Sequence, residues 1–467
     1  MEGMVESNVF FARVKQYANF FKKGLYMKTK LVKLMFLISC CCLMPTLYAT
    51  WIQDGSTATD GNWILRINTS DGVVKILGPN AGSGVLDIST IANDLGCTGV
   101  IVGNEAFIDN KNVTGLVLPD NLIELCDGAF ERCTNLAGEI STTAAFKMSG
   151  YNAFDRTAIT SAIFPNMTGS VGAWAFYECK QLKTVVFGDG ITSFGEKAFF
   201  SCSALESVLP NTLQNVTFIA NEVFKYCYAL KSSMFLPNVR EVKALAFEGV
   251  ACEEISMPSC TNMVGGCFYG SKIKKITHSP DVQLNGDVFI GCTELEELVP
   301  GKFRNLSVIK DGTFKNCNSL KSLDFTGSTF TSVNINSAQY MYEMKYLVLP
   351  ETLTDMGNWS FERIKNSDVL FRGPKPTIGG GNVFAHNGNN QKLRNNIISL
   401  EEHIASWTNA NSGVTFTPLA NVSDNQKTDD YKYPTTNIGR VIGTVNFGAS
   451  THWLSIFNEI GTIILIK

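Results

Sequence analysis

Cysteine is the residue type in this sequence whose regular spacing most suggests chemistry. Six cysteines each stand three residues after a phenylalanine: Cys133, Cys179, Cys202, Cys227, Cys292 and Cys317. Zinc sites gather four ligands through short spacings such as Cys-x-x-Cys, and the sequence contains no such spacing. Neighbours such as Cys179 and Cys202 instead lie about one structural repeat apart. Stacked neighbours would lie near disulfide range, so pairing is open to them. We favour buried free thiols that act as small apolar fillers.

Histidine offers no catalytic pattern. His278, His386, His403 and His452 are scattered, and neither Gly-x-Ser-x-Gly nor His-Glu-x-x-His occurs in the sequence. The glycine run 379–381 lacks the Lys-Ser/Thr that follows in a phosphate-binding loop. We therefore predict no catalytic residues, no metal and no cofactor, and we expect that the protein is not an enzyme.

An internal repeat determines the secondary-structure elements that position these residues. An aromatic residue recurs at Phe107, Phe130, Phe154, Phe176, Phe199, Phe224, Phe247, Phe268, Phe289, Phe314, Tyr340, Phe361 and Phe384. The mean interval of about 23 residues lies within the range of leucine-rich repeats. The aromatic residues and the cysteines together predict a structural ladder through the interior: Phe130, Cys133, Phe176, Cys179, Phe199, Cys202, Phe224, Cys227, Phe289, Cys292, Phe314 and Cys317.

The repeat unit is too short to bury its own apolar side, but stacked units cover one another. A short strand follows the cysteine in several units, as in Val185-Val186-Phe187, and its alternation places two side chains inward and one outward. A proline such as Pro119 or Pro165 then ends the strand, because it lacks an amide donor. The sequence predicts a β-rich solenoid, a leucine-rich repeat of about 13 coils of about 23 residues, with short strands on one face.

The repeated motif Ala-Phe-x-x-Cys-x-x-Leu, followed by a strand, Pro and (Ile/Phe)-Gly, resembles the BspA-type leucine-rich repeat family. The closest stretch is 180–209, which includes Ile191-x-x-Phe194-Gly195-x-x-Ala198-Phe199. The resemblance covers roughly residues 85 to 384, and the unit around Tyr340 departs from it. The resemblance implies a secreted or surface-exposed protein of a bacterium or protist, from a family linked to adhesion to host matrix proteins and other cells.

The N-terminal residues 1–49 are predicted to be an extension and a signal peptide. Met27 is a possible true start, followed by Lys28, Lys30, Lys33 and an apolar run over 34–44, with cleavage after Ala49. That run is about half the roughly 20 residues that a membrane span needs. The segment Leu37-Ile38-Ser39-Cys40 resembles a lipobox, so a lipoprotein anchored at Cys40 is the alternative.

Composition excludes a nucleic-acid partner. The chain of 467 residues has 45% hydrophobic and 17% charged residues, with a net charge of −3. Residues 1–49 carry seven Lys/Arg and two Asp/Glu, so the exported chain has 32 basic and 40 acidic residues and a net charge of −8. A chain of this charge is not built to neutralise phosphates.

Two segments flank the solenoid of 85–385. Residues 50–84 alternate apolar and polar side chains around Trp63, which predicts a β cap over the first coil. Residues 386–467 form a C-terminal cap or strand segment of uncertain fold. Within it we expect a helix over 399–407 with Ser399 and Glu402 as a capping box, and a strand over 414–417. The stretch 441–467 either pairs as strands or folds on a partner.

The outward strand positions predict a ligand-binding face at Val117, Ile163, Val186, Ser256, Thr277, Asp324 and Val348. This small and partly apolar surface suits an extracellular or host protein or peptide. A neighbouring column of Lys183, Lys231, Lys274, Lys321 and Lys345, with Glu206 and Glu296 between, either attracts an acidic partner or simply solvates the face. The alternatives are a self-associating envelope protein and an enzyme whose chemistry lies in 386–467.

Overall fold

The structure of this protein is a computed structural model. It describes residues 50–148, 150–210, 213–364, 367–379, 383–384, 395–409, 415–418, 440–447 and 450–457. The chain divides into two compact units, Met1–Ala49 and Thr50–Lys467, and all described residues belong to the second. The predicted signal peptide, Cys40 and His386 therefore lie outside the described residues.

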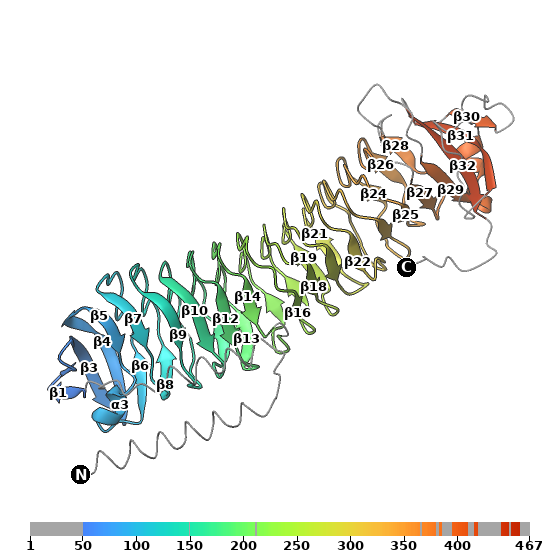
Figure 1. The fold of residues 1–467 in the computed structure, drawn as a ribbon. Helices are drawn as coiled ribbons and strands as arrows, with labels where there is room; N and C mark the ends of the chain where they lie inside the picture. Colours follow the sequence, from blue (N-terminus) through green and yellow to red (C-terminus); the bar gives the residue numbers. More distant parts are fainter. Residues whose placement is uncertain are drawn as a thin grey trace, which may run out of the picture. The chain divides into compact units, whose positions relative to one another are not determined.

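The second unit is a solenoid whose coils follow one another in sequence order (Figure 1). After the cysteine or its equivalent, a coil forms one short strand, and within each sheet this strand pairs in parallel with the same strand of the next coil. These first-strand sheets contain β9 (Ala137–Ser141), β10 (Ala158–Phe164), β12 (Thr184–Phe187) and β14 (Ser207–Leu209); β16 (Met234–Phe235), β18 (Glu254–Ser256), β20 (Lys275–Thr277) and β22 (Glu297–Val299); and β23 (Ser322–Asp324), β25 (Tyr346–Leu349), β27 (Asp368–Phe371) and β29 (Asn396–Leu400).

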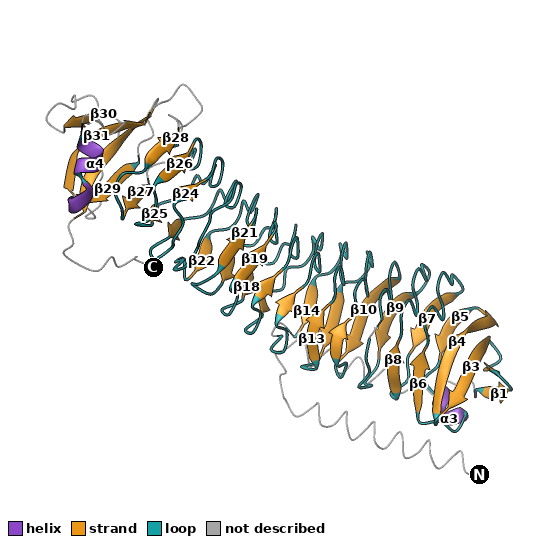
Figure 2. Ribbon diagram, turned by 180° about the vertical axis from the view of Figure 1, so that it is seen from behind, coloured by secondary structure: helices purple, strands orange, loops and turns teal. Residues whose placement is uncertain are grey.

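A second strand in most coils lines another side of the solenoid (Figure 2). The second-strand sheets contain β11 (Gly169–Val171), β13 (Ile191–Phe194), β15 (Phe218–Ile219), β17 (Glu241–Val242), β19 (Asn262–Val264) and β21 (Gln283–Asn285), and then β24 (Ser332–Val333), β26 (Asp355–Gly357) and β28 (Thr377–Gly379). The predicted solenoid is confirmed. The prediction included only one strand face. The structure has a second one, because the Ile-x-x-Phe segments of successive coils also pair with each other.

An antiparallel β-structure lies against the first coil. The strands β1 (Ile52–Asp54), β2 (Thr57–Thr59), β3 (Trp63–Ser70) and β4 (Val73–Gly82) pair in sequence order, and β4 then pairs in parallel with β6 (Gly99–Val102) and β6 with β8 (Leu122–Leu125). The strand β5 (Gly84–Asp87) pairs with β7 (Val113–Val117), and α3 (Ile91–Asp94) is a single helical turn. Trp51 and Trp63 are buried here. The edge of the first coil is thus paired rather than left open.

At the other end, the sheet of β23–β29 continues into a β-hairpin. The strand β29 pairs in parallel with β32 (Ser450–Phe457), which pairs with β31 (Arg440–Phe447), and β31 with β30 (Thr415–Pro418). Strand pairing is therefore the alternative that the described part of 441–467 adopts. The helices η1 (Glu401–His403) and α4 (Ala405–Thr408) follow β29, and the helices among the described residues are too short to cross a membrane.

The predicted helix start at Ser399 is wrong. Ser399 is the fourth residue of β29 and pairs with Phe371 of β27, and its hydroxyl donates to the carbonyl of Leu400 instead of capping a helix. The sheet hydrogen bonds of this coil outweigh the local capping signal of Ser399 and Glu402, as tertiary context commonly does. The helix of this segment begins later and buries Trp407.

The aromatic column forms the centre of the solenoid. From Phe107 to Phe314, successive phenylalanine rings stack with centroids 5.1 to 5.7 Å apart. All of these rings are buried. Such offset stacking adds to the stabilisation that comes from burying the rings, so it stabilises the packing of each coil against the next.

Tyr340 does not belong to the aromatic column. Ala338 occupies the column position, because its amide donates to the carbonyl of Ser360 in the same way that the Phe314 amide donates to Ser337. The stack is therefore interrupted between Phe314 and Phe361, and Phe361 stacks on Phe384 at 6.0 Å. Tyr340 lies two residues beyond the column, on the surface side of the turn.

From Phe107 to Phe361, the column positions are flanked by left-handed residues on both sides, except at Phe289, which has one only on its C-terminal side. Positive φ angles occur two residues before the column at Glu105, Gly128, Asn152, Trp174, Lys197, Glu222, Leu245, Gly266, Gly312, Asn336 and Trp359. They occur two residues after it at Asp109, Arg132, Arg156, Glu178, Ser201, Tyr226, Gly249, Gly270, Gly291, Asn316, Tyr340 and Arg363. We call these two rows, with the residues between them, the turn ridge. A left-handed conformation costs a non-glycine residue roughly 1 kcal/mol or more.

Candidate functional site

The cysteine ladder is a row of thiol hydrogen bonds rather than a reactive site. Each thiol donates to the main-chain carbonyl of the preceding coil's column phenylalanine, at Sγ–O distances of 2.9 to 3.2 Å: Cys133 to Phe107, Cys179 to Phe154, Cys202 to Phe176, Cys227 to Phe199, Cys292 to Phe268 and Cys317 to Phe289. This geometry explains why cysteine recurs at the position, since it fills a small apolar space and can still donate one hydrogen bond.

Burial keeps these thiols protonated. It raises the pKa of Cys133, Cys179 and Cys292 to about 12, and that of Cys202, Cys227 and Cys317 well above the ordinary value. The thiolate is the nucleophile and the metal ligand, so the ladder suits neither role at neutral pH. The eleven cysteines among the described residues are all free.

His278 is a core residue. Its ring is buried, stacks on Phe303 at 5.0 Å and shares a 2.7 Å hydrogen bond between Nδ1 and the Ser279 carbonyl. Burial lowers its pKa, so it is neutral at physiological pH. His403 is partly exposed in η1. Over the described part of the chain, no three histidine, cysteine or carboxylate side chains gather in a way that would hold a metal ion.

The predicted strand face runs along the first strands, which form several separate sheets, and Asp324 pairs with Lys302 rather than with Val299. Ile163 lies beside Val186 in register, and Ser256 lies beside Thr277. The sequence prediction missed row members from the intervening coils, namely Ser141, Leu209, Phe235 and Val299. Phe235 is 43% exposed and Val117 is 40% exposed, whereas Ile163, Val186, Ser256, Thr277 and Asp324 are partly exposed. The exposed row therefore includes apolar side chains on several neighbouring coils.

Val348 does not belong to this exposed face. It lies next to Asp324 in the row but is only 8% exposed, and it forms a small apolar cluster with Leu370 and Ile398 of the next two strands. These three outward side chains of β25, β27 and β29 are thus buried together, whereas Tyr346 of β25 is exposed. The available strand face ends at Asp324.

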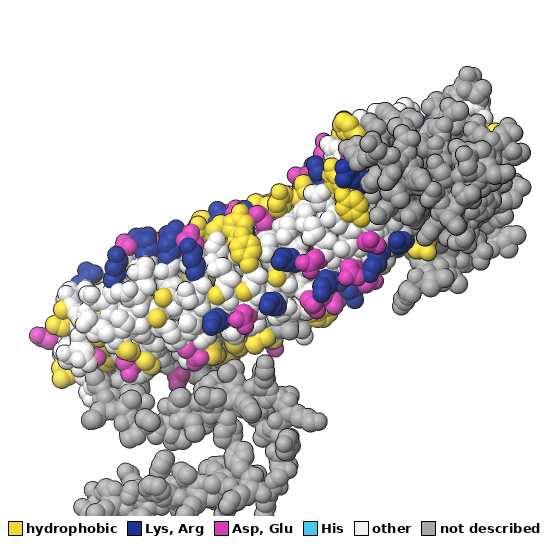
Figure 3. All heavy atoms as spheres, turned by 45° about the horizontal axis from the view of Figure 1, so that its top comes forward, with side chains coloured by type: hydrophobic (Ala, Val, Ile, Leu, Met, Phe, Trp, Pro, Cys, Tyr) yellow, Lys and Arg dark blue, Asp and Glu magenta, His cyan; other side chains and the backbone are white. Residues whose placement is uncertain are grey.

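Acidic neighbours pair with several lysines of the predicted column. Amides in the column donate to carbonyls of the preceding coil, as from Glu206 to Lys183 and from Glu296 to Lys274, and the Lys274 amide donates to Glu253, which the prediction left out. Lys274 pairs with Glu253 at 2.9 Å, and Lys321 pairs with Glu296. Side chains of both charges run together along the solenoid surface in Figure 3. Alternating charges of this kind do not form an anion-binding stripe, and they discourage aggregation.

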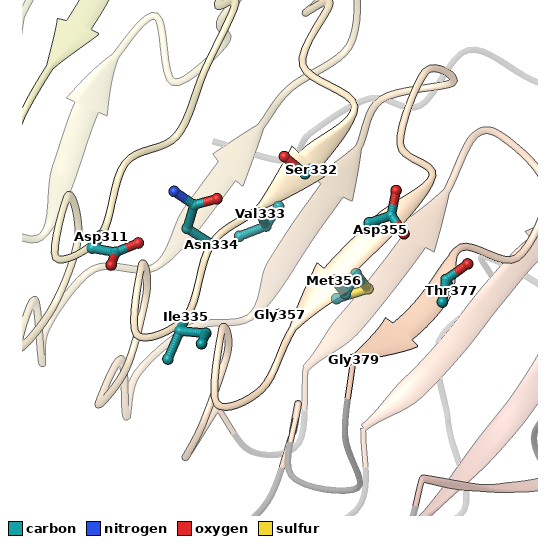
Figure 4. Close-up of a pocket in the computed structure, with 10 residues that line it drawn as sticks. All are labelled: Asp311, Ser332, Val333, Asn334, Ile335, Asp355, Met356, Gly357, Thr377 and Gly379. Carbon is teal, nitrogen blue, oxygen red and sulfur yellow. The ribbon is translucent and has the colours of Figure 1, made fainter.

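A surface hollow of about 360 Å³ lies over the second-strand sheet β24–β26–β28 (Figure 4). It is lined by Asp311, Ser332, Val333, Asn334, Ile335, Asp355, Met356, Gly357, Thr377 and Gly379. Figure 4 shows Asp311 and Asp355 well apart, with Asn334 between them. Asp355 accepts a 2.7 Å hydrogen bond from the Thr354 hydroxyl. Two carboxylates separated in this way do not face a common reacting group, as paired acid–base catalysis requires.

A second pocket, of about 320 Å³, opens on the turn ridge. It is lined by Glu131, Asn152, Asp155, Arg156, Trp174, Tyr177 and Lys197, and we call it the ridge pocket. Arg156 lies over the Tyr177 ring at 5.1 Å, and Lys197 lies over the Trp174 ring at 6.0 Å. Burial raises the pKa of the Asp155 carboxyl to about 6; Arg156 opposes this rise, and Glu131 and Glu178 add to it. None of these residues was a candidate from the sequence.

The coils, the aromatic column and the parallel strands define a leucine-rich repeat protein. The family model described as the BspA type leucine rich repeat region matches residues 100–231, 217–340 and 307–423, in six copies. The chain belongs to the BspA-type leucine-rich repeat family. No curated protein matches it.

Several solved structures are similar to this chain. A leucine-rich repeat protein from Bacteroides ovatus is 19% identical, with a TM-score of 0.48, over 73% of this chain and 94% of that one. A leucine-rich repeat protein from Eubacterium ventriosum is 17% identical, with a TM-score of 0.37, over 67% of this chain and 88% of that one. A leucine rich cell surface protein from Faecalibacterium prausnitzii is 17% identical, with a TM-score of 0.30, over 73% and 95%.

Proposed function

We propose that this protein is an exported binding protein that recognises an extracellular protein through the first-strand face of its solenoid, and that it has no catalytic activity. The proposal is carried by the row from Val117 to Asp324, in which the apolar side chains Val186, Leu209 and Phe235 lie on three consecutive coils. A row of this kind offers a partner a large and nearly rigid surface, as solenoids commonly do. Exposed apolar area on a stable scaffold is characteristic of interaction sites.

Adhesion at the cell surface is the role that we propose for this binding. It is supported by the basic, apolar and small-residue order of residues 27–49, which is that of an export signal. Cleavage after Ala49 would release the protein, whereas lipidation of Cys40 would hold it on a membrane. N-terminal sequencing of the exported protein distinguishes the two routes.

The direct test places a charge on the strand face. Full-length protein is immobilised and tested against a panel of purified extracellular matrix proteins, with Val186→Arg compared with wild type. Because Val186 points outward and is only partly buried, we expect Val186→Arg to weaken binding about tenfold or more without lowering the thermal transition.

The matched control is Thr192→Arg, which places the same charge on the second-strand side of the same coil. Thr192→Arg should bind as the wild type does. Undiminished binding by Val186→Arg, together with equivalent changes at Ile163 and Phe235, would show that the partner uses another side of the solenoid.

A further inference from the structure

A third hollow, of about 820 Å³, lies on the second-strand side of the solenoid. We call it the arginine hollow. Its volume lies within the range of roughly 300 to 1,000 Å³ that is typical of small-molecule sites. Three consecutive coils contribute the residues that line it: Gln214, Asn215, Thr217, Phe218, Asn238, Arg240, Glu241 and Ser259.

Arg240 supplies a cation that the surrounding chain does not compensate. Its side chain is exposed, and among the described residues its guanidinium forms neither an ion pair nor a hydrogen bond. The neighbouring carboxylate of Glu241 is already satisfied, because its Oε2 pairs with Nζ of Lys243 at 2.9 Å and its Oε1 accepts a 2.8 Å hydrogen bond from Asn262. Arg240, Lys243 and Glu241 together leave one positive charge at the hollow.

The fold does not require the side chains of Arg240 and Phe218. The Arg240 amide donates to the Thr217 carbonyl at 2.8 Å, and the Thr261 amide donates to the Arg240 carbonyl at 2.9 Å, so threonine occupies this position in the coils on both sides. Phe218 is 40% exposed and lies in register with the polar Glu241 of the next coil. The cation–ring contacts among the described residues all involve other rings, so the Phe218 ring remains open to a ligand.

Two amides of the hollow are held in place and offer acceptor oxygens. Nδ2 of Asn215 donates to the Asp189 carbonyl at 2.6 Å, and Nδ2 of Asn238 donates to the Gln214 carbonyl at 2.7 Å. These bonds fix each side chain on the preceding coil, whereas the two Oδ1 atoms accept no hydrogen bond from the part of the chain that the structure describes. The hollow thus combines one guanidinium, two fixed acceptors and an exposed ring.

We propose that the arginine hollow binds a sugar residue that carries a carboxylate, as in an acidic polysaccharide. The Arg240 guanidinium pairs with the carboxylate, whose planar shape it matches. Hydroxyl groups of the sugar donate to Oδ1 of Asn215 and of Asn238, and the C–H face of the sugar ring packs on Phe218. This binding activity is separate from the protein binding proposed for the first-strand face.

An acidic sugar suits the hollow better than other anions do. Phosphate or sulfate would pair with Arg240, but at neutral pH it offers mainly acceptors to the amide oxygens and no apolar face to Phe218. The side chain of an acidic peptide supplies a carboxylate without hydroxyl groups beside it. A carboxylate-bearing sugar presents the carboxylate, the hydroxyl donors and the apolar face on one ring, and the hollow holds a complementary group for each.

The test uses a defined probe with the full-length protein. The probe is a fluorescein-labelled oligosaccharide in which glucuronate alternates with N-acetylglucosamine, and its counterpart is the methyl ester, which keeps the hydroxyl groups and the rings but has no charge. Binding is measured by fluorescence anisotropy at physiological ionic strength, where attraction between distant exposed charges is screened. We expect the acid form to bind about tenfold more tightly than the ester, a difference of about 1.4 kcal/mol.

Two pairs of variants locate the effect. Arg240→Thr should bind the acid and the ester equally, whereas Lys272→Thr, which removes an exposed cation outside the hollow, should retain the preference for the acid. Phe218→Ala should weaken both forms at least about threefold, because it removes the ring under the sugar. Tyr269→Ala should bind as the wild type does, since Tyr269 is 46% exposed but lies outside the hollow.

Arg240→Thr should keep the thermal transition of the wild type, because threonine already occupies the same position in both neighbouring coils. If its transition is lowered, Arg240→Gln gives the same test, since it retains part of the side chain and removes the charge.

The inference is overturned by equal affinity for the two forms, by binding of neither, or by a preference for the acid that persists in the Arg240 variants. It is also overturned if inorganic phosphate, or a peptide in which aspartate alternates with glycine, displaces the acid form as well as unlabelled oligosaccharide does at the same concentration and ionic strength. These outcomes are separable from failure of the proposed function, because the probe contains no protein.

Discussion

Asp155→Asn should make the protein more stable at neutral pH, although it removes a charged group that forms an ion pair. In the folded chain the pKa of Asp155 is about 6, against 3.8 for an ordinary aspartate. Because the folded state holds the proton more tightly, the stability of the wild type falls as pH rises from about 4 to about 6. A shift of about two units corresponds to at most about 3 kcal/mol.

In Asp155→Asn the side chain at position 155 does not titrate, so its effect on stability does not change with pH. The exposed Arg156 loses an ion pair that is worth at most about 1 kcal/mol, so we expect a net gain of about 1 to 2 kcal/mol at pH values near 7. The gain should disappear at pH values near 4, where the wild-type carboxyl is protonated in both states.

The assay is urea unfolding of wild type and variant, followed by circular dichroism at both pH values. Glu343→Gln is the control, because its carboxylate is exposed and its substitution should leave the difference from wild type nearly constant with pH. An Asp155→Asn variant that is less stable than wild type near pH 7, or a difference that does not change with pH, would show that the Asp155 carboxylate is well compensated. The reasoning that Oδ1 of Asp155, which is buried without a hydrogen-bond partner among the described residues, makes the charged carboxylate costly would then be refuted.

Two further predictions concern the interior. Phe199→Ala removes a ring that stacks on Phe176 and Phe224, and it should cost roughly 3 to 5 kcal/mol in urea unfolding; a loss below about 1 kcal/mol would contradict the stacked column. The ladder thiols, such as Cys202, should resist iodoacetamide in the native protein at neutral pH and react once it is unfolded, as mass spectrometry would show. Rapid native labelling of Cys202 would contradict its burial and raised pKa.

The solenoid could be predicted because its signal repeats. A mean interval of about 23 residues recurs over the whole aromatic column, so that an error in one coil is corrected by its neighbours. That correction fails at Tyr340, because the aromatic residue nearest the expected place is not the column member. The hydrogen bonds instead place Ala338 in the column, and Met341 follows at the position of the cysteine. A register based on aromatic residues alone cannot recognise a coil that has lost its phenylalanine.

The surface was predicted less completely than the core. Inward and outward positions follow from strand alternation, which placed Ile163 and Val186 correctly beside each other. Burial of Val348 could not be anticipated, because it arises where Leu370 and Ile398 of later strands come together. Burial depends on contacts between distant parts of the chain, and a local sequence pattern does not predict such contacts.

The ridge pocket was missed because its residues come from neighbouring coils and lie in turns. Asp155, Trp174 and Lys197 are unremarkable when they are considered one by one in the sequence. A signal was nevertheless present: the positions two residues before and after the column phenylalanine hold glycine in some coils and large side chains in others. Comparing the repeats position by position would have found this contrast, because left-handed positions favour glycine.

The central claim, that the solenoid binds a protein through its first-strand face, is tested most directly by measuring one set of affinities side by side. Wild type, Val186→Arg and Thr192→Arg are titrated against the same purified matrix protein. The proposed strand face predicts binding by wild type and Thr192→Arg, and at least about tenfold weaker binding by Val186→Arg, with no loss of thermal stability. Equal binding by all three proteins, or no binding of any matrix protein by the wild type, would contradict the claim.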